Sequence, residues 1–306
     1  MSVAIISHPQ CIEHDLGPYH PEQPSRLNVV NDQLISSGLG YVCPQYYSDK
    51  ITRENLLRVH DSEYIDSLYA NAPTTGSYNI DGDTQMMKET LGAAEYAAGA
   101  GVMAIDLLME KKHRAAFCPV RPPGHHAERS RAMGFCFFNN VAIAAMYAID
   151  KYSLKRIAII DFDVHHGNGT QDIFEGKAEV LFCSSFEHPL YPFSGEGKTA
   201  DNVMNIPLAA STKSQEYRSA VSEWFAAIDK FSPELIIISA GFDGHIADDM
   251  SSHSLVDPDY HWLTAELVTL ADQHCEGRIL SMLEGGYAIH ALGRTVIAHL
   301  KALLKS

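Results

Sequence analysis

The sequence has few cysteines, and none of them stands in a metal-binding spacing. Its 306 residues include six cysteines without any CxxC pair, at Cys11, Cys43, Cys118, Cys136, Cys183 and Cys275. Several lie in apolar runs, where a thiol behaves as a small hydrophobic side chain. The pattern indicates a reducing compartment, and we expect a cytoplasmic protein.

Long hydrophobic runs and positive charges are also scarce. No segment reaches the roughly 18 apolar residues of a membrane span, and the N-terminus lacks a basic start followed by a long apolar stretch. Lys plus Arg number 23 against 38 Asp plus Glu, for a net charge of −15. Because this charge repels phosphate backbones and anionic lipids, we expect no direct nucleic-acid or membrane partner. It favours cationic ligands or basic peptides, or it is only an acidic solvated surface.

Short β-branched runs alternate with helical patterns along the whole chain. The predicted strands are 3–7, 115–120, 156–161, 179–185, 234–243 and 278–287. The predicted helices are 84–109, 140–151, 214–230, 258–274 and 289–305. The alternation predicts an α/β fold of three α/β/α layers with a central, open, mostly parallel sheet. Without repeats or long linkers, we expect one domain over 1–306.

The most informative segment, 157–170, reads IAIIDFDVHHGNGT. An apolar strand runs up to Asp161, and Asp163 and His165 follow at alternate positions, so the three side chains are expected on one side. A carboxylate and an imidazole suit a divalent ion such as Zn²⁺ or Fe²⁺. Asp243 follows the apolar run LIIISAGF and completes a set of three ligands, which leaves a place for water as in hydrolytic zinc sites.

Two further motifs carry groups that suit catalysis. The loop RPPGHHA places His125 and His126 side by side, where one imidazole is expected to act as a base and Asp161 to orient a ring. In LEGGY, Gly285 and Gly286 precede Tyr287, whose phenol is suited to donate to a developing oxyanion. Taken alone, adjacent loop histidines are more often solvated side chains, and a tyrosine after glycines is more often a packing residue.

Loop aromatics are expected to wall a narrow channel. Phe135 follows Gly134 in MGFCFFNN, and Tyr191 lies in PLYPFSG. The polar, turn-rich segment 71–83 is expected as a surface excursion near the mouth of the site.

Taken together and in this order, RPPGHHA, GFCFFNN, DFDVHHGNGTQ, SAGFD and LEGGY resemble the histone deacetylase superfamily, with HPEQPSR at 20–26 fitting its N-terminal signature. The resemblance covers nearly the whole chain. It implies an arginase/deacetylase-like open sheet and a zinc-dependent amidohydrolase that acts on acetylated amines, such as an acetyl-lysine peptide.

The resemblance also implies a role for each site residue. Asp163, His165 and Asp243 match the family's metal ligands. His126 matches its general base and acid, and His125 its electrostatic partner.

Other positions match supporting groups of the family. Tyr287 matches the phenol that polarises the substrate carbonyl. Asp161 matches the carboxylate behind His125, and Asn168 the amide behind His126, as in the class II branch. The substrate-binding positions are Gly134, Phe135, Tyr191, Gly285 and Gly286. Arg26 resembles an arginine of the inner product cavity, and a structural K⁺ near Asp161, His165 and Ser184 is implied only by the resemblance.

The chain departs from the family at the channel. Phe186 stands where many relatives have histidine, and Phe193 replaces a usual glycine, so a different channel rim is expected. Met250 occupies the position where polyamine-specialised relatives carry a glutamate, which makes polyamine specialisation less favoured. An acetyl-lysine protein, an acetylated polyamine, another small amide and longer acyl groups all stay open as substrates.

Two other classes of function stay open, as does the oligomeric state. The chain could be an acyl-amine binding module without turnover, although no ligand or base is missing. It could also be an arginase-like ureohydrolase with two Mn²⁺, although the motifs supply few ligands for a second ion.

Overall fold

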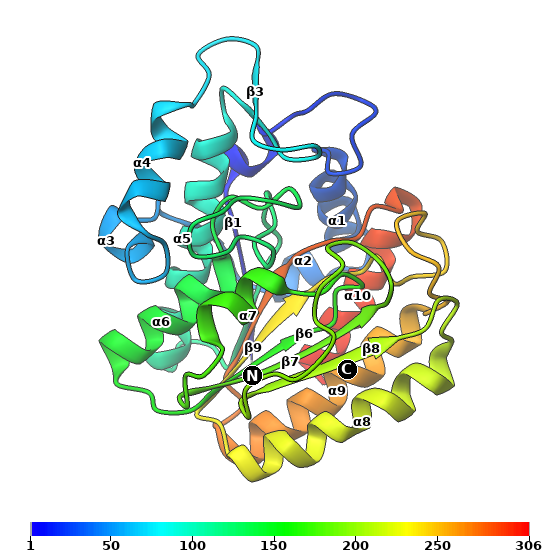
Figure 1. Ribbon diagram of the computed structural model, residues 1–306. Helices are drawn as coiled ribbons and strands as arrows, with labels where there is room; N and C mark the ends of the chain where they lie inside the picture. Colours follow the sequence, from blue (N-terminus) through cyan, green and yellow to red (C-terminus); the bar gives the residue numbers. More distant parts are fainter. Residues whose placement is uncertain (1, 306) are drawn as a thin grey trace.

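A mainly hydrophobic sheet of eight parallel strands forms the centre of the molecule (Figure 1). The structure is a computed structural model, and it describes residues 2–305. In spatial order the strands are β2 (Gln45–Tyr47), β1 (Val3–Ser7), β5 (Ala115–Cys118), β10 (Ile279–Leu283), β9 (Leu235–Ala240), β6 (Ile157–Asp161), β7 (Val180–Glu187) and β8 (Val203–Leu208). The predicted α/β class with a mostly parallel sheet is confirmed.

Helices cover both faces of the sheet (Figure 1). On one face lie α5 (Thr90–Met109) and α6 (Asn140–Tyr152), which pack on each other. On the other face lie α1 (Ser25–Ser36), α8 (Ser214–Phe231), α9 (Asp257–His274) and α10 (Ile289–Leu304). Shorter helices are η1 (Pro9–Ile12), α2 (Leu39–Val42), α3 (Arg53–Leu56), α4 (Ser62–Ala70) and α7 (Asn168–Phe174).

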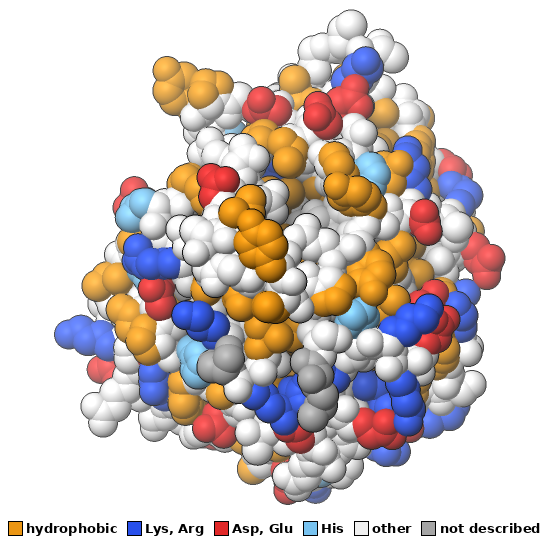
Figure 2. Space-filling model, turned by 180° about the vertical axis from the view of Figure 1, so that it is seen from behind, with side chains coloured by type: hydrophobic (Ala, Val, Ile, Leu, Met, Phe, Trp, Pro, Cys, Tyr) orange, Lys and Arg blue, Asp and Glu red, His pale blue; other side chains and the backbone are white. Residues whose placement is uncertain are grey.

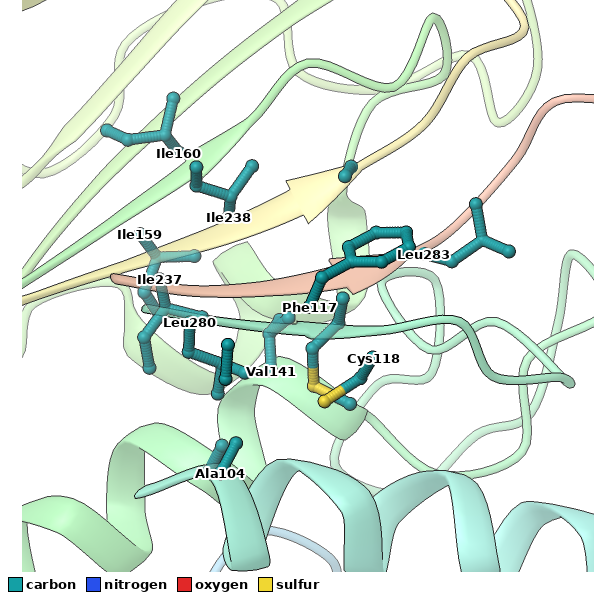
Figure 3. Close-up of a cluster of buried hydrophobic side chains, with 14 of the residues drawn as sticks. Ala104, Phe117, Cys118, Val141, Ile159, Ile160, Ile237, Ile238, Leu280 and Leu283 are labelled. Carbon is teal, nitrogen blue, oxygen red and sulfur yellow. The ribbon is translucent and has the colours of Figure 1, made fainter. Parts of the chain in front are cut away.

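The central strands read as continuous apolar runs because both of their faces are buried. Figure 3 shows Ile159, Ile237 and Leu280 on the side of the sheet that faces Ala104 of α5 and Val141 of α6. These side chains are fully buried. The packing fixes the register of the strands and therefore the place where each of them ends.

Helix α5 is long and apolar enough to span a membrane by length and composition alone, which the sequence analysis did not expect of any segment. In the structure, 67% of its apolar window is buried. Its alanines pack beside α6 and the sheet, so the apolar composition is accounted for by the interior of the fold.

One predicted helix was too long. The pattern predicted a helix over 84–109, but Gln85–Met87 form β4, which pairs antiparallel with β3 (Ser77–Asn79). The fully buried Met86 lies opposite Tyr78 in this pairing, and the helix begins only at Thr90. Tertiary burial of one methionine therefore outweighs the local helical pattern.

The surface carries its charges unevenly. Figure 2 shows one face with hydrophobic side chains scattered among polar ones and with Lys and Arg side chains gathered in its lower part. Around a hollow at the amino ends of β5 and β10 lie Lys111, Lys112, Arg114 and Arg278. These basic side chains are at the edge of the sheet opposite to the carboxyl ends of the strands, where the acidic motif residues lie.

Candidate metal and catalytic site

Four neighbouring strands in the middle of the sheet bring the motif residues together. In the order β5, β10, β9 and β6, the strands are adjacent, and each of them ends just before a polar motif. Because parallel strands end at the same edge, the loops after them converge in one crevice. The predicted strands over 234–243 and 278–287 stop earlier, at Ala240 and Leu283, so GFD and EGGY belong to loops.

The predicted ligands Asp163, His165 and Asp243 meet in this crevice. All three are buried, and their ligand atoms lie within 4.8 Å of one another. Nδ1 of His165 is 3.0 Å from Oδ1 of Asp163 and 3.1 Å from Oδ2 of Asp243. Two carboxylates and one imidazole nitrogen this close together suit a divalent metal ion and leave a coordination position free.

Hydrogen bonds from backbone N–H groups, and not alternation along a strand, orient these side chains. Strand β6 ends at Asp161, so Asp163 and His165 lie in the loop beyond it. The prediction that strand alternation places them on one side was therefore wrong. The N–H of His165 donates to Oδ1 of Asp163, 2.9 Å away, and the N–H of Val164 donates to Oδ1 of Asp243 at the same distance. The loop therefore folds around its own carboxylates.

The pKa values of the cluster indicate an excess of buried negative charge. Burial, with the nearby Asp163, raises the pKa of Asp243 to about 7. Burial would lower the pKa of His165, but hydrogen bonds to Asp163 and Asp243 outweigh it and raise that pKa to about 10. Protons on His165 and Asp243 thus offset excess buried negative charge at neutral pH. A divalent cation would displace them, so the residues fit a metal ion.

Glycines are required next to the cluster because the carboxylates are packed against the backbone. A Cβ on Gly285 would lie 2.1 Å from Oδ2 of Asp243 and 2.6 Å from Oδ2 of Asp163. The N–H of Gly285 also donates to Oδ2 of Asp163 over 2.8 Å. Gly285, predicted from the sequence as a substrate-binding residue, lies in the structure beside two candidate ligand carboxylates and donates to one of them. Gly286 follows in the left-handed region, with φ +117°.

His125 and His126 lie side by side in the loop after β5, with their rings tilted by 40° to each other. Their ring centroids are 4.0 Å apart, and both rings are buried. Nδ1 of His125 is 2.9 Å from Oδ2 of Asp161, as the sequence analysis expected of that carboxylate. Burial would lower the pKa of His125, but Asp161 and Asp163 raise it well above its usual value, so His125 is the cationic member of the pair.

His126 has the opposite character. Its pKa lies well below the usual value, first because of burial and then because of the positive His125 and His165. Nδ1 of His126 is 2.7 Å from Oδ1 of Asn168, while Nδ2 of the same amide donates to Glu128 over 2.7 Å. The amide oxygen therefore faces the imidazole, which assigns the proton to Nδ1 of His126 and leaves Nε2 as the basic atom.

Tyr287 follows the two glycines, and its position is fixed by contacts to Asp248 and Arg26. The carboxylate of Asp248 accepts from the N–H of Tyr287 over 2.6 Å and from the N–H of Ala288 over 2.8 Å. Arg26 lies 4.9 Å from the centre of the Tyr287 ring and donates through Nε to the carbonyl of Gly286. Burial raises the pKa of the phenol well above its ordinary value, so the phenol keeps its proton.

Aromatic rings line the approach to these groups. The ring of Phe135 lies edge-on to Tyr287, with centroids 6.1 Å apart, and that of Tyr191 lies 5.3 Å from His126. Gly134, at φ +55°, leaves room for His126, because a Cβ there would lie 2.3 Å from Cδ2 of the ring. The structure thus places Phe135 beside Tyr287, and Gly134 and Tyr191 beside His126; that they line a substrate channel stays a prediction.

The excursion 71–83 does reach the mouth of the channel. The hydroxyl of Thr84, immediately after it, accepts from the N–H of Phe135 over 3.2 Å. The carboxylate of Asp83 accepts a hydrogen bond from the backbone N–H of Gly134. Phe186, in contrast, is 1% exposed and packs against His166, so it does not form part of the rim as the sequence analysis proposed. The exposed aromatic group in this region is Phe193.

Sequence reasoning missed two supporting carboxylates. Glu284 is fully buried and accepts through Oε2 from the N–H groups of Gly124, at 2.6 Å, and His125, at 3.1 Å. Asp248, two residues before Met250, also has a buried side chain. Glu284 lies in the LEGGY motif and Asp248 in none of the motifs, and the inward direction of a loop side chain has no periodic signal in the sequence.

Comparison with known proteins assigns the arrangement to a family. Residues 20–303 match the family described as "Histone deacetylase domain". The chain is 35% identical to a "Probable deacetylase" of Archaeoglobus fulgidus, over 94% of this chain and 82% of that protein. It is also 35% identical to "Polyamine deacetylase HDAC10" of Danio rerio, over 92% of this chain and 44% of that protein. The solved structure "Crystal Structure of HDA15 HD domain" superposes with a TM-score of 0.93 at 31% identity and covers 100% of this chain and 90% of that one.

The close approach of Gly285 predicts a metal-binding defect. We expect Gly285→Ala to weaken zinc binding by about 10- to 100-fold, because the added Cβ displaces two ligand carboxylates. Zinc affinity is measured by competition with a chromophoric chelator. Gly82→Ala is the matched control, since a Cβ on Gly82 meets nothing within 4 Å. Equal zinc affinity of Gly285→Ala and the unmodified protein would contradict the geometry.

The protonated cluster predicts that metal binding releases protons. His165 and Asp243 have raised pKa values of about 10 and about 7, and their protons must leave before the metal binds. Apparent zinc affinity is therefore expected to rise between pH 6 and pH 8, by up to about tenfold per pH unit for each proton released. Calorimetric titration in buffers of different ionisation enthalpy counts these protons, and a count of zero would show that the cluster is already deprotonated.

Proposed function

Because this chain belongs to the histone deacetylase family, we propose that it is a zinc-dependent hydrolase that removes acetyl or related acyl groups from acylated amines such as acetyl-lysine. The observation that carries the proposal is the buried cluster of Asp163, His165 and Asp243 beside a basic Nε2 of His126. Phe135 and Tyr191, whose rings pack against Tyr287 and His126, are proposed to line a channel to this cluster, which would suit an extended, largely apolar acyl-lysine side chain.

Asp163, His165 and Asp243 would hold the zinc ion. When bound, the ion would polarise the acyl carbonyl and lower the pKa of a water from 15.7 toward roughly 7. Fe²⁺ is served by the same three donors, so the native metal is proposed from the family and from the carboxylate and imidazole donor set.

His126 is proposed as the group that moves the proton. Its lowered pKa keeps Nε2 free at neutral pH, so it can take a proton from the attacking water and return it to the leaving amine nitrogen. Asn168 keeps the ring in the required orientation through Nδ1. His125, which Asp161 keeps protonated, places a positive charge 4.0 Å from the ring of His126 and keeps the pKa of His126 low.

Tyr287 is proposed to stabilise the developing oxyanion. Its phenol stays protonated and is therefore a hydrogen-bond donor across the pH range of enzyme assays. Arg26 beneath the ring and Asp248 on the backbone hold the residue at the end of the channel. This preorganisation matters because a donor that is already in place costs no reorganisation when the charge develops.

A structural K⁺ is proposed behind the zinc loop. The hydroxyl oxygen of Ser184 is buried and has no hydrogen-bond partner, and Ser184 lies opposite Asp161 in the pairing of β7 with β6. Burial raises the pKa of Asp161 although His125 acts in the opposite direction, so a further cation beside this carboxylate would be favourable. Potassium, which takes oxygen ligands, fits both observations.

Among substrates, acylated lysine in a peptide is favoured over acetylpolyamines. One relative is named as a polyamine deacetylase, so polyamines stay the alternative. At the gate this chain presents Met250, a half-buried thioether without charge, whereas an ammonium group of a polyamine calls for a carboxylate there. Turnover of acetyl-lysine peptides against acetylpolyamines on zinc-loaded protein decides between the two substrates.

Two rival functions make different predictions. A binding module without turnover would bind acyl-lysine peptides and release no acetate. A two-manganese ureohydrolase needs ligands for a second ion, and a metal count of two per chain would support it. Within residues 2–305, Asp163, His165 and Asp243 are the one set of three candidate ligands whose atoms lie this close together.

The proposal predicts that the phenol is needed for turnover and not for metal binding. In an acetate-release assay on an acetyl-lysine peptide, Tyr287→Phe is expected to lower kcat by about 100-fold, because one oxyanion donor is lost. Zinc content, measured by metal analysis, stays at one per chain. Tyr41→Phe is the control, since Tyr41 is 83% exposed on α2. Unchanged turnover in Tyr287→Phe would remove the phenol from the reaction, and acetate release that persists with chelator would exclude the metal.

The amide behind His126 predicts a shift in the pH profile. Asn168→Asp places a negative charge 2.7 Å from Nδ1 of His126 and is expected to raise the pKa of this base by about one unit or more. Since the base must be neutral, the acid limb of kcat/KM moves to higher pH by the same amount. Asn71→Asp makes the same change at an exposed position and serves as the control. An acid limb that stays in place would show that His126 is not the titrating base.

A further inference from the structure

Phe193 combines two features that are individually unfavourable. Its side chain is 73% exposed, although it is one of the larger apolar side chains of the protein. Its backbone has φ +59°, in the left-handed region that side chains with a Cβ rarely adopt. Glycine takes this φ without strain, so the turn itself does not require phenylalanine. The ring gains little burial within the chain to offset the strained backbone.

The turn that carries Phe193 is fixed on both sides. The N–H of Phe193 donates to the carbonyl of Leu190 over 2.8 Å and closes the turn. Before it, the ring of Tyr191 packs 5.3 Å from His126 in the channel. After it, the hydroxyl of Ser194 is 2.8 Å from Nδ1 of His166, the residue next to the metal ligand His165. The turn that carries the exposed ring is therefore held between Tyr191, which contacts His126, and His166, the residue next to a metal-ligand candidate.

Charged side chains near the turn indicate the kind of ligand that the Phe193 ring would contact. Burial, and then Asp83, Cys136 and Asp81, raise the pKa of Tyr191, while Arg131 lowers it, so two carboxylates and one guanidinium act on this residue. A basic peptide suits these carboxylates, and an apolar side chain of that peptide suits the exposed ring. Backbone strain of this kind is concentrated at active sites and in loops that contact ligands.

We propose that Phe193 determines specificity by contacting a bulky apolar side chain that flanks the acyl-lysine of a peptide substrate. The inference rests on the proposed deacetylase function and narrows its substrate class to peptides. Acetylpolyamines and other small acylated amines have no side chain outside the channel for the ring to contact, so they gain nothing from Phe193.

The test compares two acetyl-lysine peptides that differ only in the flanking residues, leucine in one and glycine in the other, together with N-acetylputrescine. For the zinc-loaded protein we expect kcat/KM to be about five- to tenfold higher for the leucine peptide than for the glycine peptide. In Phe193→Gly this ratio falls to about one, and the loss is confined to the leucine peptide. Phe193→Asn removes the ring while tolerating the same φ, and it is expected to behave in the same way.

Measurements of thermal stability and oligomeric state distinguish a role of Phe193 in peptide specificity from a role in packing or self-association. Phe193→Gly is expected to leave Tm unchanged or raise it, because strain is relieved and little packing is lost. Ser153→Gly is the matched control, since Ser153 has φ +58° at the exposed end of α6, by the amino edge of the sheet, and its substitution leaves the peptide ratio unchanged. A clear fall of Tm in Phe193→Gly, or conversion of an oligomer to a monomer in light scattering, would overturn the proposal in favour of packing or self-association.

Binding measurements distinguish failure of this inference from failure of the proposed function. Peptide affinity is measured by fluorescence anisotropy with the same two peptides. If the leucine peptide binds more tightly and loses this advantage in Phe193→Gly, but neither peptide is hydrolysed, the inference stands and the deacetylase function falls. If both peptides are hydrolysed equally by the unmodified protein, or Phe193→Gly slows N-acetylputrescine as much as the leucine peptide, the function stands and the inference falls.

Discussion

The structure depends on a concentration of buried negative charge that its own chain only partly neutralises. Asp161, Asp163, Asp243 and Glu284 all lie buried at the carboxyl edge of four adjacent strands. Without an ion, protons on His165 and Asp243 and a cationic His125 make up the difference. Burying unpaired charge is costly, so the cluster is stable only with a cation or its equivalent in protons. The surrounding glycines, amide groups and imidazoles all follow from this requirement.

The sequence was sufficient for the class of fold and for the residues that gather in the crevice. Apolar runs that end in Asp161 and in GFD predict buried parallel strands, and parallel strands bring their carboxyl ends together. The ends of the strands were less well predicted. The predicted strand over 278–287 stops at Leu283. Beyond it, Gly285 packs against the carboxylates of Asp163 and Asp243 and does not continue the hydrogen-bond ladder of the sheet. The aim of Asp163 and His165 comes from loop N–H groups, which have no periodicity to read.

Other parts of the site could not be read from one sequence for the same reason. Asp248 and Glu284 act through side chains that turn inward from loops, and such a turn depends on distant N–H groups, such as those of Tyr287 and Gly124. Phe186 was expected at the rim because of its place in a motif, yet it extends β7 and is covered by His166. The strained φ of Phe193 is likewise a property of the folded turn.

One carboxylate links two parts of the channel that are usually considered separately. Oδ2 of Asp248 accepts from the N–H of Tyr287, and Oδ1 accepts from the N–H of Met250 over 3.1 Å. Met250 and Tyr287 thus share one buried anchor. On the proposed function, a substitution at Met250 that shifts this segment would also shift Tyr287, the proposed oxyanion donor, so Asp248 would couple substrate choice to turnover through the backbone.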